Sequence, residues 1–184
     1  MQASVAYIEN GLTWLISMNR LLAALLLLVT SLPTNGAGTW VQTPYKPARV
    51  IFEFYLDDPN KLGSALYWLR SLINPLLESP YNYSPEDMSI KVVIHGTEIV
   101  TLAKKNEEKY QEFVDRMRYY ADIGVEFKVC SQAAEDFGYS EKDLHDFVHV
   151  VPNAITELAH WQQLGYALIT PRIYEKHFAI EEIR

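Results

Sequence analysis

The sequence is poor in cysteine: Cys130 is the only one among 184 residues. A single cysteine cannot form an internal disulfide, so a framework of disulfide bonds is excluded for this chain. An unpaired thiol indicates a reactive group or an intermolecular bond. The simplest alternative is a small buried apolar residue, because free cysteine is among the most buried residue types. Composition alone leaves both interpretations open.

Positive charge is also in short supply, with 16 basic against 23 acidic residues and a formal net charge of −7. An acidic chain lacks the basic surface that attracts phosphate backbones, so we do not expect a nucleic-acid partner. The motifs GxGxxG, GxxxxGK[ST], GxSxG and HExxH are absent. His145 and His149 are four residues apart, but they fall around a predicted strand, where that spacing does not form a metal site. We therefore expect neither a cofactor nor a metal.

No hydrophobic run is long enough to be a clear transmembrane helix. The apolar stretch Leu21–Leu32 is well short of the about 20 residues that a membrane span needs. Arg20 precedes it, and small or turn-forming residues follow as far as Ala37, which is typical of a secretory signal peptide. We predict a signal peptide over residues 1–37, with Met18 as a possible true start, and export to the periplasm without further membrane contact. The alternative is a membrane anchor through residues 12–32.

The rest of the chain is long enough for one domain with its own core. Residues 38–48 read as an extended lead-in with two prolines, residues 49–172 as an α/β domain, and residues 173–184 as an amphipathic tail that can form a helix. Within the domain, apolar strand-like runs alternate with amphipathic helical runs. The five predicted strands are Arg49–Leu56, Ser89–His95, Val125–Cys130, Phe147–Val151 and Gly165–Thr170. This alternation predicts a parallel sheet with helices on both faces.

In such sheets, binding and catalytic residues usually lie at the carboxyl ends of the strands. The third predicted strand ends at Cys130, which places the thiol at this edge. Backbone N–H groups at the start of the following helix stabilise a thiolate, which can hold sulfur as a persulfide. His95 ends the second strand and is a candidate for orienting an anion or exchanging a proton with the thiol; alternatively, it hydrogen-bonds a loop. Glu98 is a candidate auxiliary proton-transfer group; alternatively, its charge complements a helix N-terminus.

Three segments together resemble the DsrE/DsrF-like family, in particular its small exported, stand-alone members. They are Lys91–Glu98 (KVVIHGTE), Gly124–Cys130 (GVEFKVC) and Val150–Pro171. The resemblance implies a three-layer α/β/α fold with a five-stranded parallel sheet, and homo-oligomers such as trimers or hexamers. It also implies that Cys130 carries persulfide sulfur between partner proteins. His95 and Glu98 match residues that recur in the family after the second strand.

The leading hypothesis is a periplasmic sulfur carrier or sulfurtransferase-like protein that uses Cys130, His95 and Glu98 with sulfur-donor and sulfur-acceptor proteins. Whether it is an enzyme stays open. The main alternative is a non-catalytic homo-oligomeric binding module in which Cys130 is structural, and a third is a thiol redox sensor that forms intermolecular disulfides.

Overall fold

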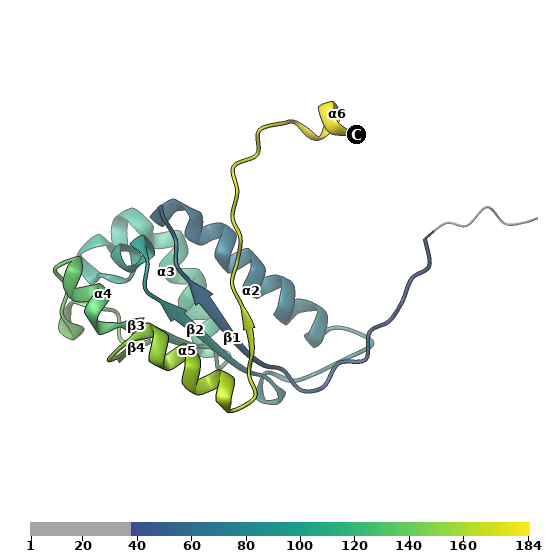
Figure 1. The fold of residues 1–184 in the computed structure, drawn as a ribbon, viewed down its shortest axis with the longest axis horizontal. Helices are drawn as coiled ribbons and strands as arrows, with labels where there is room; N and C mark the ends of the chain where they lie inside the picture. The colour runs from purple at the N-terminus through teal and green to yellow at the C-terminus, as the bar shows by residue number, and fades with distance from the viewer. Residues whose placement is uncertain (1–37) are drawn as a thin grey trace, which may run out of the picture. The chain divides into compact units, whose positions relative to one another are not determined.

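The computed structural model describes residues 38–184, and residues 44–184 form one compact unit within it (Figure 1). The predicted signal peptide falls on residues 1–37, outside the described part, and stays a prediction. Residues 38–46 contain no helix or strand. Among the described residues, no helix is both long enough and apolar enough to cross a membrane.

Five strands form one sheet in which every neighbouring pair is parallel, in the order β4-β3-β2-β1-β5. Their bounds are β1 Arg49–Phe54, β2 Ser89–Ile94, β3 Glu126–Cys130, β4 Val148–Val151 and β5 Ala167–Ile169. The predicted five-stranded parallel sheet is therefore confirmed. The strands are short and separated by helical segments, as parallel pairing requires.

Helices cover both faces of the sheet, which gives the three-layer architecture expected. The α-helices are α2 Leu62–Leu77, α3 Glu107–Asp122, α4 Ser131–Asp136, α5 Ala154–Gln163 and α6 Ile180–Ile183. Short 3₁₀ helices occupy Pro59–Lys61, Pro85–Asp87, Thr97–Leu102, Lys104–Asn106 and Glu141–Asp143. In Figure 1, α5 lies on the opposite side of the sheet from α2 and α3.

The two faces of the sheet differ in character because side chains alternate along each strand. The face beneath α2 and α3 carries the main apolar core, which includes Phe52, Phe54 and Phe127. The face beneath α5 carries a smaller buried cluster, which consists of Ile51, Val93, Cys130, Ala154, Leu158 and Tyr166. Polar side chains can therefore occupy the α5 face towards the carboxyl ends of the strands, beyond this small cluster.

Local capping sets where the first helical segment begins, and Pro75 does not end it. The Asp58 side chain accepts a hydrogen bond from the Asn60 N–H at 2.8 Å, and Pro59 follows as the first residue of the 3₁₀ turn that leads into α2. Proline inside a helix removes one backbone hydrogen bond and commonly kinks or ends the helix. Instead α2 continues to Leu77, so Pro75 lies within its last turn.

Candidate functional site

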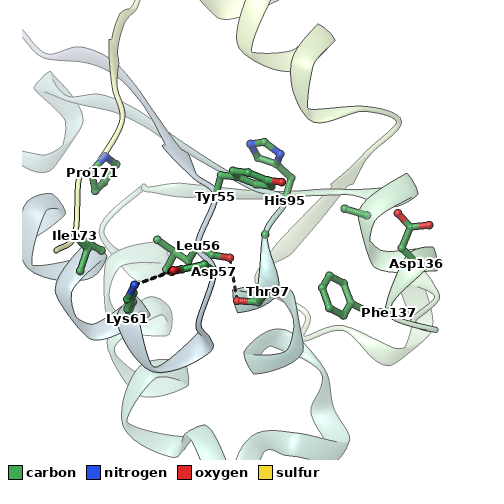
Figure 2. A pocket seen from close by; sticks show the side chains of 12 residues that line it. Tyr55, Leu56, Asp57, Lys61, His95, Thr97, Asp136, Phe137, Pro171 and Ile173 are labelled. Atoms are coloured by element: carbon green, nitrogen blue, oxygen red, sulfur yellow. Dashed lines mark hydrogen bonds and ion pairs between the residues drawn. The ribbon is translucent and has the colours of Figure 1, made fainter. Parts of the chain in front are cut away.

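A pocket of about 440 Å³ lies beside the carboxyl ends of β1, β2 and β5 (Figure 2). Tyr55 and Leu56 follow β1, His95 follows β2, Pro171 follows β5, and Phe137 closes the side next to α4. The walls combine apolar and aromatic side chains with polar and charged groups, which include Asp57, Lys61 and Asp136. The ends of three of the five strands, β1, β2 and β5, therefore meet at one opening.

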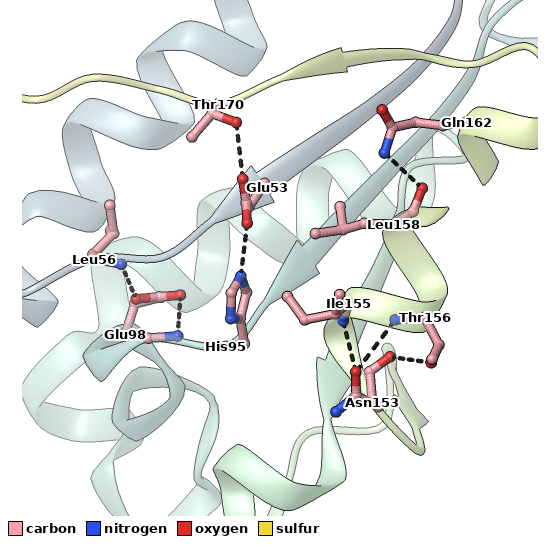
Figure 3. A network of polar contacts seen from close by, with 11 residues as sticks. Glu53, Leu56, His95, Glu98, Asn153, Ile155, Thr156, Leu158, Gln162 and Thr170 are labelled. Carbon is pink, nitrogen blue, oxygen red and sulfur yellow. Dashed lines mark hydrogen bonds and ion pairs between the residues drawn. The ribbon is translucent and has the colours of Figure 1, made fainter. Parts of the chain in front are cut away.

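His95 is held in this pocket by Glu53 on β1 and Tyr55 just after it. Its Nε2 lies 3.2 Å from Oε1 of Glu53, whose Oε2 accepts a hydrogen bond from the Thr170 hydroxyl at 2.9 Å (Figure 3). The His95 ring stacks on Tyr55 with 4.7 Å between ring centroids. A chain of hydrogen bonds therefore runs from the end of β5 through β1 to the end of β2.

Glu98 is fully buried and does not line the pocket. Its carboxylate accepts hydrogen bonds from the backbone N–H groups of Leu56, at 2.9 Å, and Gly96, at 3.0 Å (Figure 3). Because Leu56 and Gly96 themselves line the pocket, Glu98 ties together the two strand ends that form its wall. This contact differs from both interpretations offered by the sequence, since it neither reaches the opening nor merely complements a helix N-terminus.

The carboxyl group of Glu98 gives the domain an expected pH dependence. Burial raises its pKa from 4.5 to about 7, although the backbone hydrogen bonds oppose the shift. Between these pH values the folded chain holds a proton that the unfolded chain releases. The free energy of unfolding should therefore fall as pH rises through this window, by about 3 kcal/mol from this group alone.

Thermal unfolding of the wild-type protein and of Glu98→Gln at pH 5 and pH 8 measures this effect. The midpoint should drop more between pH 5 and pH 8 in the wild type than in the variant, which cannot titrate at this position. Equal drops in the two proteins would assign the pH dependence to other groups.

Cys130 lies at the end of β3, as expected, but its side chain is covered. The residue is 4% exposed and packs with Val93 and with Ala154 and Leu158 of α5. It does not line the pocket, whereas Ala133, in the first turn of α4, does. The structure thus brings the thiol near the opening without exposing it.

Cys130 and His95 nevertheless occupy equivalent levels on neighbouring strands. Ile94 pairs with Val129, so each of the two residues is one position past this pair. His95 N–H still bonds the Phe54 carbonyl at 3.1 Å, and Cys130 still pairs with Val151, so both remain in the sheet. Val93, two residues before His95, lies in the same buried cluster as Cys130, so by alternation the His95 and Cys130 side chains project from the same face of neighbouring strands, whose backbones lie about 5 Å apart.

Glu53, Tyr55 and Thr170 were not among the site residues predicted from the sequence. A signal for two of them is present, because Glu53 interrupts an otherwise apolar strand and Tyr55, two residues on, points to the same face. Thr170 offered no local signal. Within residues 38–184, no group of three or more His, Cys, Asp or Glu side chains is arranged to hold a metal ion.

Comparisons with known proteins place the fold among relatives. A model of the DsrE/DsrF-like family matches residues 57–171. The solved structure of a protein of unknown function, MTH1491 from Methanobacterium thermoautotrophicum, superimposes with a TM-score of 0.54 at 25% identity, over 67% of this chain and 99% of that one. A comparison with curated proteins gives no significant match. The family match spans more than half of the sequence, with β1 and the pocket residues Tyr55, Leu56 and Ile173 outside it, and we conclude that the chain belongs to the DsrE/DsrF-like family.

Proposed function

We propose that this protein is a sulfur carrier that holds sulfane sulfur as a persulfide on Cys130. Membership of the DsrE/DsrF-like family suggests a role of the sulfur-relay type in general. The observation that carries the proposal is the placement of Cys130 and His95 at one level on neighbouring strands, beside a pocket at the carboxyl edge of the sheet. Sulfur transfer requires a thiol and a group that can take its proton, and these two residues lie on neighbouring strands.

The transfer needs no oxidant or reductant. The Cys130 thiol gives its proton to His95, and the thiolate attacks the terminal sulfur of a donor persulfide, R–S–SH. A bond forms between Sγ of Cys130 and that sulfur, the S–S bond of the donor breaks, and the leaving thiolate R–S⁻ takes the proton from His95. The products are the Cys130 persulfide and R–SH. Attack by an acceptor thiolate on the outer sulfur then passes it on.

Burial of Cys130 imposes one condition on this chemistry. Cys130 shares a buried cluster with Ala154 and Leu158 of α5, and Ala133 of α4 packs against it, so this cover has to open before a donor can reach the sulfur. Glu98 acts as an auxiliary in this scheme by holding the Leu56 and Gly96 backbones that form the pocket wall.

Exposure to polysulfide is expected to add one sulfur, about 32 Da, to the intact protein, and a reducing agent should remove it. Peptide mapping should place the added mass on Cys130, and the Cys130→Ser variant should gain nothing under the same conditions. An unmodified wild-type protein, in a reaction where an exposed control thiol is fully persulfidated, would contradict the proposal.

A second function is favoured by the burial of the thiol. In this alternative the protein is a non-catalytic, homo-oligomeric binding module, and Cys130 contributes packing to the cluster beneath α5. Replacement by alanine would then lower the stability of the domain without altering binding in the pocket. The accessibility of the thiol, taken up in the Discussion, separates the two functions.

We also propose that the protein acts as an exported homo-oligomer, a trimer or hexamer. Family members are often oligomeric, and the segment after β5 leaves four large apolar side chains exposed: Tyr174, Phe178, Ile180 and Ile183. Light scattering measures the assembly, and a monomer at micromolar concentration would contradict it. Export is tested by N-terminal sequencing of the protein from a periplasmic fraction, which should begin near Gly38.

A further inference from the structure

The carboxylate of Glu53 stands between two side chains that come from far apart in the sequence. It accepts a hydrogen bond from the Thr170 hydroxyl at 2.9 Å and lies 3.2 Å from Nε2 of His95 (Figure 3). The side chains of Glu53 and His95 are 22% and 13% exposed, so solvent has limited access to this pair. The arrangement joins the carboxyl ends of β5, β1 and β2 directly beside the pocket.

The chemistry of the three groups fixes the direction of each hydrogen bond. An ionised carboxylate can only accept, so Thr170 donates to one oxygen and the Nε2–H of His95 donates to the other. Stacking on Tyr55 restrains the plane of the imidazole ring. Within residues 38–184, Nδ1 of His95 has no hydrogen-bond partner, and His95 lines the pocket. In the neutral form of the ring, the lone pair of Nδ1 is thus the acceptor left for a group in or beside the pocket.

We infer that Glu53 and Thr170 are positioning residues that hold neutral His95 in the Nε2–H tautomer, so that Nδ1 serves as the proton acceptor of this site. The inference rests on the proposed function in taking His95 as the proton-transfer group for the thiol. It extends that function by two residues on separate strands. A carboxylate that orients a histidine in this way is a recurrent device for keeping the other ring nitrogen available to a nucleophile.

Long-range ¹H–¹⁵N correlation spectra of the neutral imidazole report the tautomer directly. The wild-type protein should show a single Nε2–H species for His95. In Glu53→Gln the side-chain amide can also donate to Nε2, so a population with the hydrogen on Nδ1 should appear. Thr170→Val removes the hydroxyl that holds the carboxylate and should mix the tautomers, whereas Thr170→Ser keeps the hydroxyl and should retain the single species.

The same variants are then assayed for the rate of persulfide formation on Cys130, with Glu112→Gln on the exposed face of α3 as the control for loss of one carboxylate. We expect Glu53→Gln to slow the reaction at least tenfold. An unchanged His95 tautomer in Glu53→Gln and Thr170→Val would overturn the inference even if Cys130 of the wild type takes up sulfur. If the variants do change the His95 tautomer but Cys130 of the wild type takes up no sulfur, the positioning role is supported and the sulfur-carrier proposal is overturned instead.

Discussion

Replacing Gly96 by alanine is expected to destabilise the domain by about 3 kcal/mol or more, because the added methyl group has no space. A Cβ at this position would lie 2.4 Å from the Leu56 nitrogen, 2.7 Å from the Leu56 oxygen and 2.5 Å from Oε2 of Glu98. Two of these three atoms belong to the backbone at the end of β1 and cannot rotate away. The clash would push the ends of β1 and β2 apart and break the hydrogen bonds that the Glu98 carboxylate accepts.

The cause of this sensitivity is steric and does not lie in the backbone conformation. Gly96 has φ −104°, which any residue adopts. Gly165 offers a matched control of the opposite kind, since its φ is 84° but nothing lies within 4 Å of an added Cβ. Alanine at Gly165 should cost only the penalty of a left-handed conformation, about 1–2 kcal/mol.

Urea unfolding of the two variants beside the wild type measures the difference. If Gly96→Ala lost no more stability than Gly165→Ala, the close packing of Glu98 against the two strand ends would be wrong. Because Leu56 and Gly96 line the pocket, any Gly96→Ala protein that does fold should also show altered binding there.

The fold was predictable because its signals are local. Each strand is a short apolar run, and each is followed by a stretch with helical periodicity, so parallel pairing through crossover connections was the available solution. The end of β3 at Cys130 and the end of β2 just before His95 follow from the same reasoning, as do the bounds of the strands to within about two residues.

The chemistry around His95 was less predictable because it depends on which strands become neighbours. Thr170 and Glu53 are 117 residues apart in the sequence and meet only because β5 adds to the edge of β1. Glu98 posed a different difficulty. Its position after β2 is evident from the sequence, but its contact with the Leu56 N–H requires the ends of β1 and β2 to lie side by side. Neither contact leaves a mark in local composition.

The burial of Cys130 in the structure differs from the exposed position that the sequence predicts for its thiol. A strand end that precedes a helix was expected to present the thiol, because the carboxyl edge of a parallel sheet is where pockets form. In the structure, Cys130 is buried in one cluster with Ala154 and Leu158 of α5, and Ala133 of α4 packs against that cluster. The packing of a helix that begins more than twenty residues later therefore contributes to the burial of this side chain.

Alkylation of Cys130 by iodoacetamide is therefore expected to be at least about 100-fold slower in the folded protein than in the chain unfolded in urea. A residue that is 4% exposed reacts only through openings of its cover, and an opening free energy of about 3 kcal/mol corresponds to this factor. Leu158→Ala thins the cover and should raise the rate in the folded protein, whereas Leu164→Ala, at a residue that is 46% exposed just after α5, should leave it nearly unchanged.

Comparison of alkylation with persulfide formation across these variants separates the two candidate functions. If movement of α5 admits a sulfur donor, the rate of alkylation and the rate of persulfide formation should rise together in Leu158→Ala. Binding of the donor should also speed the alkylation of Cys130 in the wild type. If the protein is a binding module, the thiol should stay protected against both reagents while the pocket remains competent to bind. Alkylation of the native wild-type protein at the rate of the unfolded chain would contradict the burial of Cys130 in this cluster.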